Sequence, residues 1–399
     1  MKVLVIGDAT STNLGDPVLT HSAAYLVKKI VASEQLGYEV EEFSIVERIP
    51  SNFHQSKNVA QTSPIKEKRI LAIGNLFSKL KVIINWLIRD RKSFLSRLEK
   101  QISCDQKTIF VIAGGAMISN SWVYALRLNE IVSYAEKSGG KVVFNSVGIE
   151  KTIAKSVTRF FYRKMLKKNA VVAFSTRDNS DEVKKLTNRK QFYKQTADPG
   201  VFCSEAYGVA KKTQEIVGIG VISTQAYHSI SKINKKAKEI SEDTLIEFWH
   251  NLIVELEKKH IKWKIFSNGG PKDYLMACKL IEKYNYPKEK LLELPLSPEQ
   301  LVLQISGFSA IVAHRLHALI IATSLNIPVI PVVWSNKVQK FAELIKISNL
   351  AVWPDVNIVP KISEMLSDKD FKTNETAIKQ LKTQAYEYIK DSINCSNSK

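Results

Sequence analysis

Cysteine is scarce in this chain, and the cysteines present are scattered. Cys104, Cys203, Cys278 and Cys395 show no paired spacing and no neighbouring histidine cluster. A disulfide framework and a structural zinc site both need clustered ligands, so we expect neither, and we expect no metal at the functional site. This cysteine usage is typical of a reducing compartment.

Nucleotide-binding signatures and a leader segment are also missing. The loop GDATSTNLGDP at 7–17 has neither GxGxxG spacing nor the GK[ST] ending of a P-loop. The chain starts directly with the apolar stretch Val3–Ile6, so we expect a cytoplasmic protein. Helix-turn-helix and RRM patterns are absent as well, which counts against a nucleic-acid partner.

Basic residues, in contrast, are in excess. The 399 residues carry a net charge of +19 and are 45% hydrophobic. Such hydrophobic content favours folded domains, and the length favours two of them. The charge indicates an anionic partner, which could be nucleic acid, lipid headgroups or an acidic small substrate.

Short apolar runs alternate with helical patterns along both halves of the chain. This alternation predicts an α/β protein with two Rossmann-like domains on parallel sheets. We predict an N-terminal domain at 1–210, a C-terminal domain at 211–370, and a final helix and tail at 371–399. Buried strands are expected, for example, at Thr108–Ala113, Leu291–Leu294 and Ala310–Ala313. The cleft between the two domains is the expected site.

One amphipathic segment stands apart from this alternation. Residues 70–88 carry apolar side chains at helical spacing, within a basic region at 66–100. A helix of this kind could lie on an anionic membrane, with Trp86 at headgroup depth, at the inner face of the plasma membrane. A helix packed on the domain's own sheet explains the pattern at least as well.

The stretch Ser309–Val333 predicts a buried strand, a tight turn and a helix. His314, Arg315 and His317 occupy the turn, where a helix amino-terminus presents N–H groups and a positive dipole to an anion. Arginine in a first helical turn is often only a surface charge, and a histidine on an apolar helix is often a core residue. Taken alone, the turn leaves both readings open.

Other predicted strand ends carry polar or glycine-rich loops. Asn13, Gly15 and Asp16 follow the first strand, and Asp16 is expected to cap the next helix. Gly114 and Gly115 follow the strand at 108–113, and Arg177 follows a strand near 171–175. In parallel sheets these ends share one edge, so the loops should face the same cleft.

With NLGD, GG, STRD and RLH in this order, the chain resembles the polysaccharide pyruvyl transferase family over nearly its whole length. The resemblance implies two Rossmann-type domains in a GT-B-like arrangement. It also implies transfer of a pyruvyl group from phosphoenolpyruvate onto two hydroxyls of a sugar, giving a cyclic ketal. The acceptor would be a polysaccharide or its lipid-linked precursor, and no cofactor is implied.

The resemblance also assigns roles to residues of this chain. Arg177, Arg315 and His317 would hold the donor, with Leu316 offering its backbone N–H. The residues that match the family's remaining motif positions are Asn13, Gly15, Asp16, Gly114, Gly115 and Lys337. The chain departs from the family pattern at Ala116, at Asn120, where an acidic residue is common, and at Trp334, Ser335 and Asn336 before the lysine.

Chemistry fits these assignments. Two arginines can hold a carboxylate and a phosphate by charge-assisted bonds, His317 suits a general acid, and Asp16 is our choice for the base. Two alternatives remain. One is a GT-B glycosyltransferase that uses a nucleotide sugar, and the other is a non-catalytic protein that binds anionic glycan.

Overall fold

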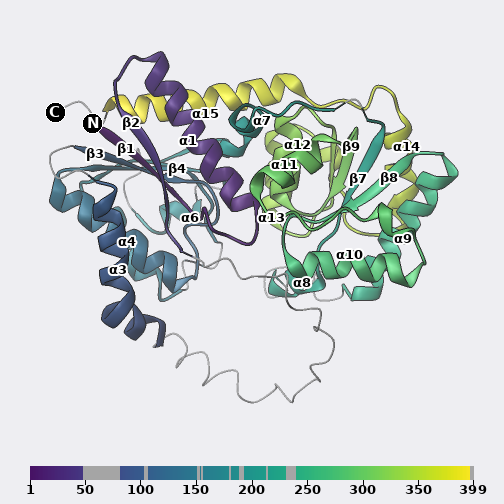
Figure 1. Ribbon diagram of the computed structural model, residues 1–399, viewed down its shortest axis with the longest axis horizontal. Coiled ribbons are helices and arrows are strands. Elements are labelled where there is room, and N and C mark those ends of the chain that lie inside the picture. The colour runs from purple at the N-terminus through teal and green to yellow at the C-terminus, as the bar shows by residue number, and fades with distance from the viewer. Residues whose placement is uncertain are drawn as a thin grey trace.

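The computed structural model describes residues 1–47, 81–102, 107–150, 153, 156–178, 181–187, 193–212, 214–230 and 240–395. In this part of the chain there are two α/β units, each built on its own parallel sheet (Figure 1). The predicted fold class is therefore confirmed. Residues 66–80 of the predicted basic region lie outside the described ranges.

The first unit is organised around a sheet of order β2-β1-β3-β4-β5-β6 in the described residues, with every neighbouring pair parallel. Continuous apolar runs form its central strands, because helices cover both faces of the sheet. The strands are β1 (Lys2–Gly7), β2 (Glu39–Ser44), β3 (Thr108–Ala113), β4 (Lys141–Val147), β5 (Val171–Thr176) and β6 (Tyr193–Gln195). The helices are α1 (Gly15–Ser33), α3 (Arg91–Lys100), α4 (Trp122–Ser138), α5 (Arg159–Leu166), α6 (Asp181–Lys184) and α7 (Cys203–Tyr207).

The second unit has a smaller parallel sheet of order β10-β9-β7-β8. Its strands are β7 (Ile216–Gly220), β8 (Lys262–Phe266), β9 (Ala310–Ala313) and β10 (Val329–Pro331). Its helices are α8 (Thr224–Ile230), α9 (Glu242–Lys258), α10 (Pro271–Lys283), α11 (Pro298–Ser306), α12 (Leu316–Ser324), α13 (Asn336–Leu344) and α14 (Val359–Ser367). The strand predicted at Leu291–Leu294 is wrong, because only a single bridge joins Leu291 to Ile265.

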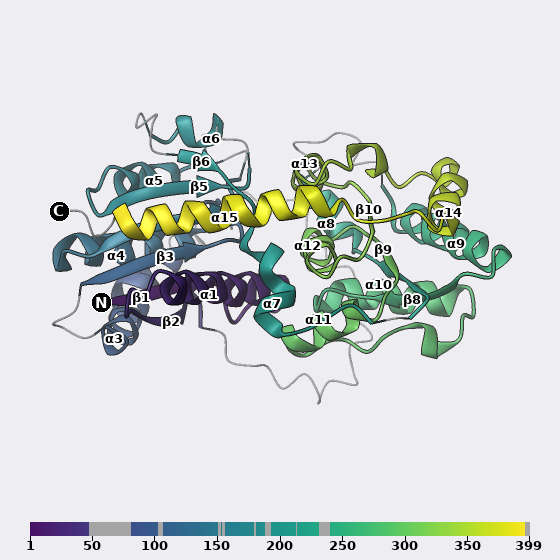
Figure 2. The same ribbon diagram turned by 90° about the horizontal axis from the view of Figure 1, so that it is seen from above.

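A last helix, α15 (Glu375–Cys395), runs from the second unit back across the first sheet (Figure 2). Its Tyr388 hydroxyl donates a hydrogen bond of 2.9 Å to the backbone oxygen of Phe144 in β4. Apolar side chains of α1, α11, α12 and α15 belong to one buried cluster, which includes Val18, Leu301, Ile320 and Leu381. This shared core joins the two units.

Two local predictions need correction. Helix α1 begins at Gly15 with Leu14 as its N-cap and no side-chain cap bond, so Asp16 lies inside the first turn and does not cap the helix. Trp86 is 5% exposed and packs against Phe94 at 5.5 Å between ring centroids, so it does not face outward. Within the described ranges, no helix is both long and apolar enough to cross a bilayer.

Candidate active site

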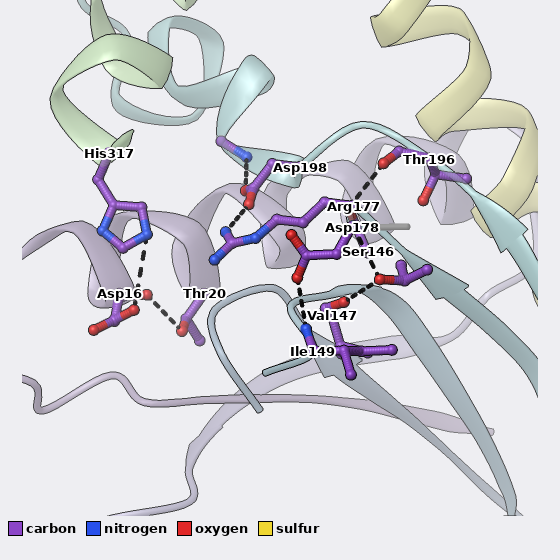
Figure 3. Close-up of polar contacts among 12 residues, drawn as sticks. Asp16, Thr20, Ser146, Val147, Ile149, Arg177, Asp178, Thr196, Asp198 and His317 are labelled. Atoms are coloured by element: carbon purple, nitrogen blue, oxygen red, sulfur yellow. Dashed lines mark hydrogen bonds and ion pairs between the residues drawn. The ribbon is translucent and has the colours of Figure 1, made fainter. Parts of the chain in front are cut away.

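Loops at the carboxyl ends of several strands meet at the boundary between the two units (Figure 3). The first unit contributes Asp16 after β1 and Arg177 directly after β5, and the second contributes His317 in the first turn of α12. Figure 3 shows the guanidinium of Arg177 extending toward His317, with Asp16 beside the imidazole ring. These three residues, predicted separately from the sequence, therefore lie together.

His317 is held closely against the first unit. Its side chain is only 10% exposed, and its Nε2 lies 3.9 Å from Oδ1 of Asp16. A Cβ atom on Gly15 would stand 2.0 Å from Nδ1 of His317, so only glycine allows the ring to approach this closely. The glycine of the NLGD loop is thus required by the neighbouring histidine.

Arg177 is buried, with 6% of its surface exposed, and Nη1 forms an ion pair with the equally buried Asp198. Among the described residues, no acceptor lies within hydrogen-bond distance of its Nε. A Cβ on Gly148 would lie 3.2 Å from both Nε and Nη2, so this glycine keeps space beside the guanidinium. A buried guanidinium with an unused N–H is prepared for an additional anion.

Arg315 is held differently. Its Nε and Nη2 donate hydrogen bonds of 2.7 and 3.0 Å to the two carboxylate oxygens of Asp273, which is buried in the first turn of α10. The backbone N–H of Ser223 donates to the same carboxylate at 2.9 Å, and the guanidinium carbon lies 5.9 Å from the centre of the Trp334 ring. Arg315 is thus oriented by a fork of two bonds while a quarter of its side chain remains exposed.

Helix α12 brings its amino-terminus to this place. Arg315 is the N-cap residue, and it makes no side-chain cap hydrogen bond. The first N–H groups of a helix have no intrahelical acceptor and carry the positive end of the dipole. A cavity between the units adjoins this turn, and its walls include Arg177, Asp178, Asp198, Leu316, Ile320 and Lys337.

Burial and neighbouring charges set the protonation of the site. Burial, with Arg177, Lys337 and Arg315 nearby, lowers the pKa of His317 to about 3, so the ring is neutral near pH 7. Burial, with Asp8 nearby, raises the pKa of Asp16. Burial and the charge of Arg177 lower the pKa of Lys337. The site therefore places Arg177 and Lys337 near a carboxylate suited to accepting a proton.

The remaining predicted residues have different surroundings. Asn13 and Gly115 border Asp16: the amide nitrogen of Asn13 lies 3.2 Å from its Oδ2, and a Cβ on Gly115 would lie 3.5 Å from its Oδ1. Gly114 packs against Leu19, and Leu316 and Lys337 line the cavity. Asn120 is exposed, and its backbone N–H donates a hydrogen bond of 2.6 Å to Oε2 of Glu150.

His314, in contrast, faces away from the cleft. It is fully buried in the core of the second unit, with its ring 5.6 Å from that of Tyr227 and 5.1 Å from that of Trp249. Its neighbour Trp334 donates its indole N–H to the backbone oxygen of His314 at 2.9 Å. The structure thus does not bring His314 together with Arg177 and His317.

Sequence reasoning missed the partners of the predicted cations. Asp198 pairs with Arg177, Asp273 with Arg315, and Asn268 contacts Asn13 at 2.9 Å across the two units. Each follows a strand or opens a helix at the same sheet edge as the predicted residues. A search for polar residues at every strand end, including weak strands such as β6, would have found Asp198 and Asn268.

A family model matches most of the chain. The model described as polysaccharide pyruvyl transferase matches residues 34–336. The match includes Gly114, Gly115, Arg177, Arg315 and His317 and ends just before Lys337. None of the curated proteins matches the chain.

Two solved structures are similar to this chain over nearly its whole length. The Staphylococcus aureus MnaA–UDP co-structure is 12% identical with a TM-score of 0.48, and the match covers 98% of this chain and 97% of that one. The UDP-GlcNAc 2-epimerase from Methanocaldococcus jannaschii is 11% identical with a TM-score of 0.49, covering 97% and 100%.

Proposed function

Because the chain belongs to the polysaccharide pyruvyl transferase family, we propose that it transfers the pyruvyl group of phosphoenolpyruvate onto two hydroxyls of a sugar. The observation that carries this proposal is the meeting of three features in one buried place. They are the unused Nε of Arg177, the uncapped amino-terminus of α12 and the ring of His317.

The donor is a small molecule with two anionic groups. A carboxylate can take the unused Nε–H of Arg177, and a phosphate can take the N–H groups that open α12, including that of Leu316. Arg315 and Lys337 add positive charge from the second unit, and both act on His317 in the unliganded site. The two units would thus share one donor, which requires the closed arrangement of the cleft.

His317 is the proposed proton donor. The phosphate dianion beside it would raise its pKa from the present value of about 3, because an anion favours the imidazolium. The proton goes to the methylene carbon of the enol and makes it a methyl group. The adjacent carbon then accepts the oxygen of the first sugar hydroxyl, whose proton passes to Asp16. Phosphate leaves with its bonding electrons, and the second hydroxyl closes the ketal and loses its proton to the phosphate.

Asn13, Gly15, Gly114, Gly115 and Asn120 are proposed to lie on the acceptor side. They belong to the first unit and follow β1 and β3, and Asn13 and Gly115 border Asp16. The acceptor we propose is a sugar of a polysaccharide or of its lipid-linked precursor.

Phosphate release from phosphoenolpyruvate tests the function. Purified protein is assayed with lipid-linked and free galactosides, glucosides and mannosides, and the product is examined for a ketal. His317→Ala should reduce release by about 10²-fold or more while circular dichroism stays unchanged. Near-normal turnover in this variant would remove the proposed acid.

Thermal-shift titration separates the donor classes, because a ligand stabilises the state that it binds. Stabilisation by phosphoenolpyruvate supports the proposal. Stabilisation by a nucleotide sugar alone would favour a glycosyltransferase. Salt-sensitive binding of an anionic glycan without turnover would favour a binding protein.

We also propose contact with an anionic membrane through the region that precedes α3. Ile84, Leu87 and Ile88 are 44%, 64% and 69% exposed, and the basic residues Arg89, Arg91 and Lys92 beside them are exposed as well. Sedimentation with phosphatidylglycerol vesicles at low salt tests this idea, with Leu87→Ser as the variant and Leu275→Ser, on the second unit, as the control. Absence of sedimentation by the wild-type protein would contradict it.

A further inference from the structure

A pair of asparagine amides connects the two units beside His317. Asn268, in the loop after β8, is 2% exposed, and its Nδ2 donates a hydrogen bond of 2.9 Å to Oδ1 of Asn13. Asn13 belongs to the loop between β1 and α1 of the other unit. The amide of Asn13 is thereby oriented with its nitrogen toward the site.

That nitrogen has two neighbours. It lies 3.2 Å from Oδ2 of Asp16 and 3.5 Å from Nδ1 of His317. An ionised carboxylate only accepts hydrogen bonds, and an amide nitrogen only donates them. The ring nitrogen that faces Asn13 must therefore present a lone pair, which places the proton of the neutral imidazole on Nε2.

The other ring nitrogen faces Asp16. Nε2 of His317 is buried and has no hydrogen-bond partner in the described part of the chain, while Oδ1 of Asp16 lies 3.9 Å away. A second proton can enter the ring only at Nδ1, where the N–H of Asn13 stands at present. Charging His317 therefore requires Asn13 to turn its amide and present Oδ1 to the ring.

We propose that Asn13 and Asn268 form an amide pair that controls the protonation of His317, with Asn268 as the positioning residue. In the observed orientation the ring stays neutral with its proton on Nε2. In the turned orientation both amides rotate: Oδ1 of Asn13 accepts a bond from Nδ1–H of His317, and Nδ2 of Asn13 donates to Oδ1 of Asn268. In the observed orientation that oxygen is buried and without a partner among the described residues, so the turn would give it a donor. Oδ2 of Asp16 would then keep the hydroxyl of Ser11 as its donor.

Charged groups around the ring bias the two orientations. Arg177, Lys337 and Arg315 disfavour the imidazolium, and Asp198 favours it, with Asp16 3.9 Å from Nε2. A bound dianion would, like Asp198, favour the charged ring and so the turned orientation of the Asn13–Asn268 amide pair. The use of the charged His317 ring in pyruvyl transfer rests on the proposed function. The tautomer of His317 in the unliganded protein does not depend on that function.

Nitrogen NMR of protein labelled with ¹⁵N-histidine tests the proposal without substrate. His317→Gln identifies the His317 signals, since the chain has only seven histidines. In the wild-type protein near pH 7, the proton should reside on Nε2. In Asn268→Asp, the new carboxylate should accept a hydrogen bond from the amide N–H of Asn13 and hold the Asn13 amide in the turned orientation. The proton should then move to Nδ1, and the pKa of His317 should rise by about one or more.

Asn285→Asp is the matched control, because it adds the same charge at an exposed position of the second unit. It should leave the His317 signals unchanged. A wild-type ring protonated on Nδ1, or an unchanged tautomer in folded Asn268→Asp, would overturn the proposal. Asn268→Ala, which removes the bond without adding charge, should give a mixture of both tautomers. If the wild-type protein releases no phosphate from phosphoenolpyruvate, the proposed function fails while the ring result still stands.

Discussion

Acidification should destabilise the second unit through His314. This side chain is fully buried between Tyr227 and Trp249, and neither ring nitrogen has a hydrogen-bond partner in the described residues. Burial, with the charge of Arg315 nearby, lowers the pKa of His314 to about 3. The folded protein thus holds this histidine neutral at a pH where the unfolded chain protonates it.

The sign and size of the effect follow from proton linkage. The unfolded chain binds a proton on His314 below its pKa of about 6.5, whereas the folded chain does so only near a pKa of about 3. Stability linked to this residue is complete above about pH 6.5 and is lost as the pH falls toward 3. Between pH 7 and pH 5 the loss is about 2 kcal/mol, because it grows by about 1.4 kcal/mol per pH unit below the unfolded pKa.

Urea unfolding at pH 7 and pH 5, followed by tryptophan fluorescence, measures this loss. Four of the six tryptophans lie in the second unit: Trp249, Trp263, Trp334 and Trp353. His314→Leu should lose about 2 kcal/mol less than the wild-type protein between the two pH values. His228→Leu, at an exposed position, is the control and should behave like the wild type. Equal losses in wild type and His314→Leu would refute the reasoning.

Three further substitutions test the site. Gly15→Ala places a Cβ 2.0 Å from Nδ1 of His317, so kcat should fall by about 10²-fold as the ring is displaced. Steady-state phosphate release measures kcat, and an unchanged kcat would contradict the close packing of His317 on Gly15. Arg315→Lys loses the fork to Asp273, so the KM for phosphoenolpyruvate should rise by about tenfold with a smaller change in kcat. Asp273→Asn should raise the same KM by removing the charge that orients Arg315, and a KM equal to wild type would show that the pair is only structural.

Much of the fold follows from local pattern. Thr108–Ala113 and Ala310–Ala313 were predicted as strands with the bounds that the structure has, because a short apolar run between polar turns has few other solutions in an α/β chain. The prediction at Leu291–Leu294 was wrong because Glu293 and the prolines near it leave only one bridge to β8. Trp86 was misplaced because its burial depends on Phe94 and Arg127, which local periodicity does not reveal.

The site was predictable at its strand ends and less so beyond them. Arg177 and His317 could be found because each follows a buried strand at a sheet's ligand edge. The prediction that His314 lies in the site together with His317 was wrong, because His314 is fully buried in the core. Successive residues at a strand end point alternately to the cleft and to the core. The pairing of Arg315 with Asp273, 42 residues away, depends on tertiary packing that no local pattern contains.

The return of α15 to the first unit has a mechanical consequence. The chain passes between the units twice, once after α7 and once after α14, and Tyr388 fixes the far end of α15 to β4. Two connections restrict the opening of the cleft to rotation of one unit about the line that joins them. A single connection would also permit the units to twist against each other. Donor and acceptor must then enter from the free side of the gap, opposite that axis.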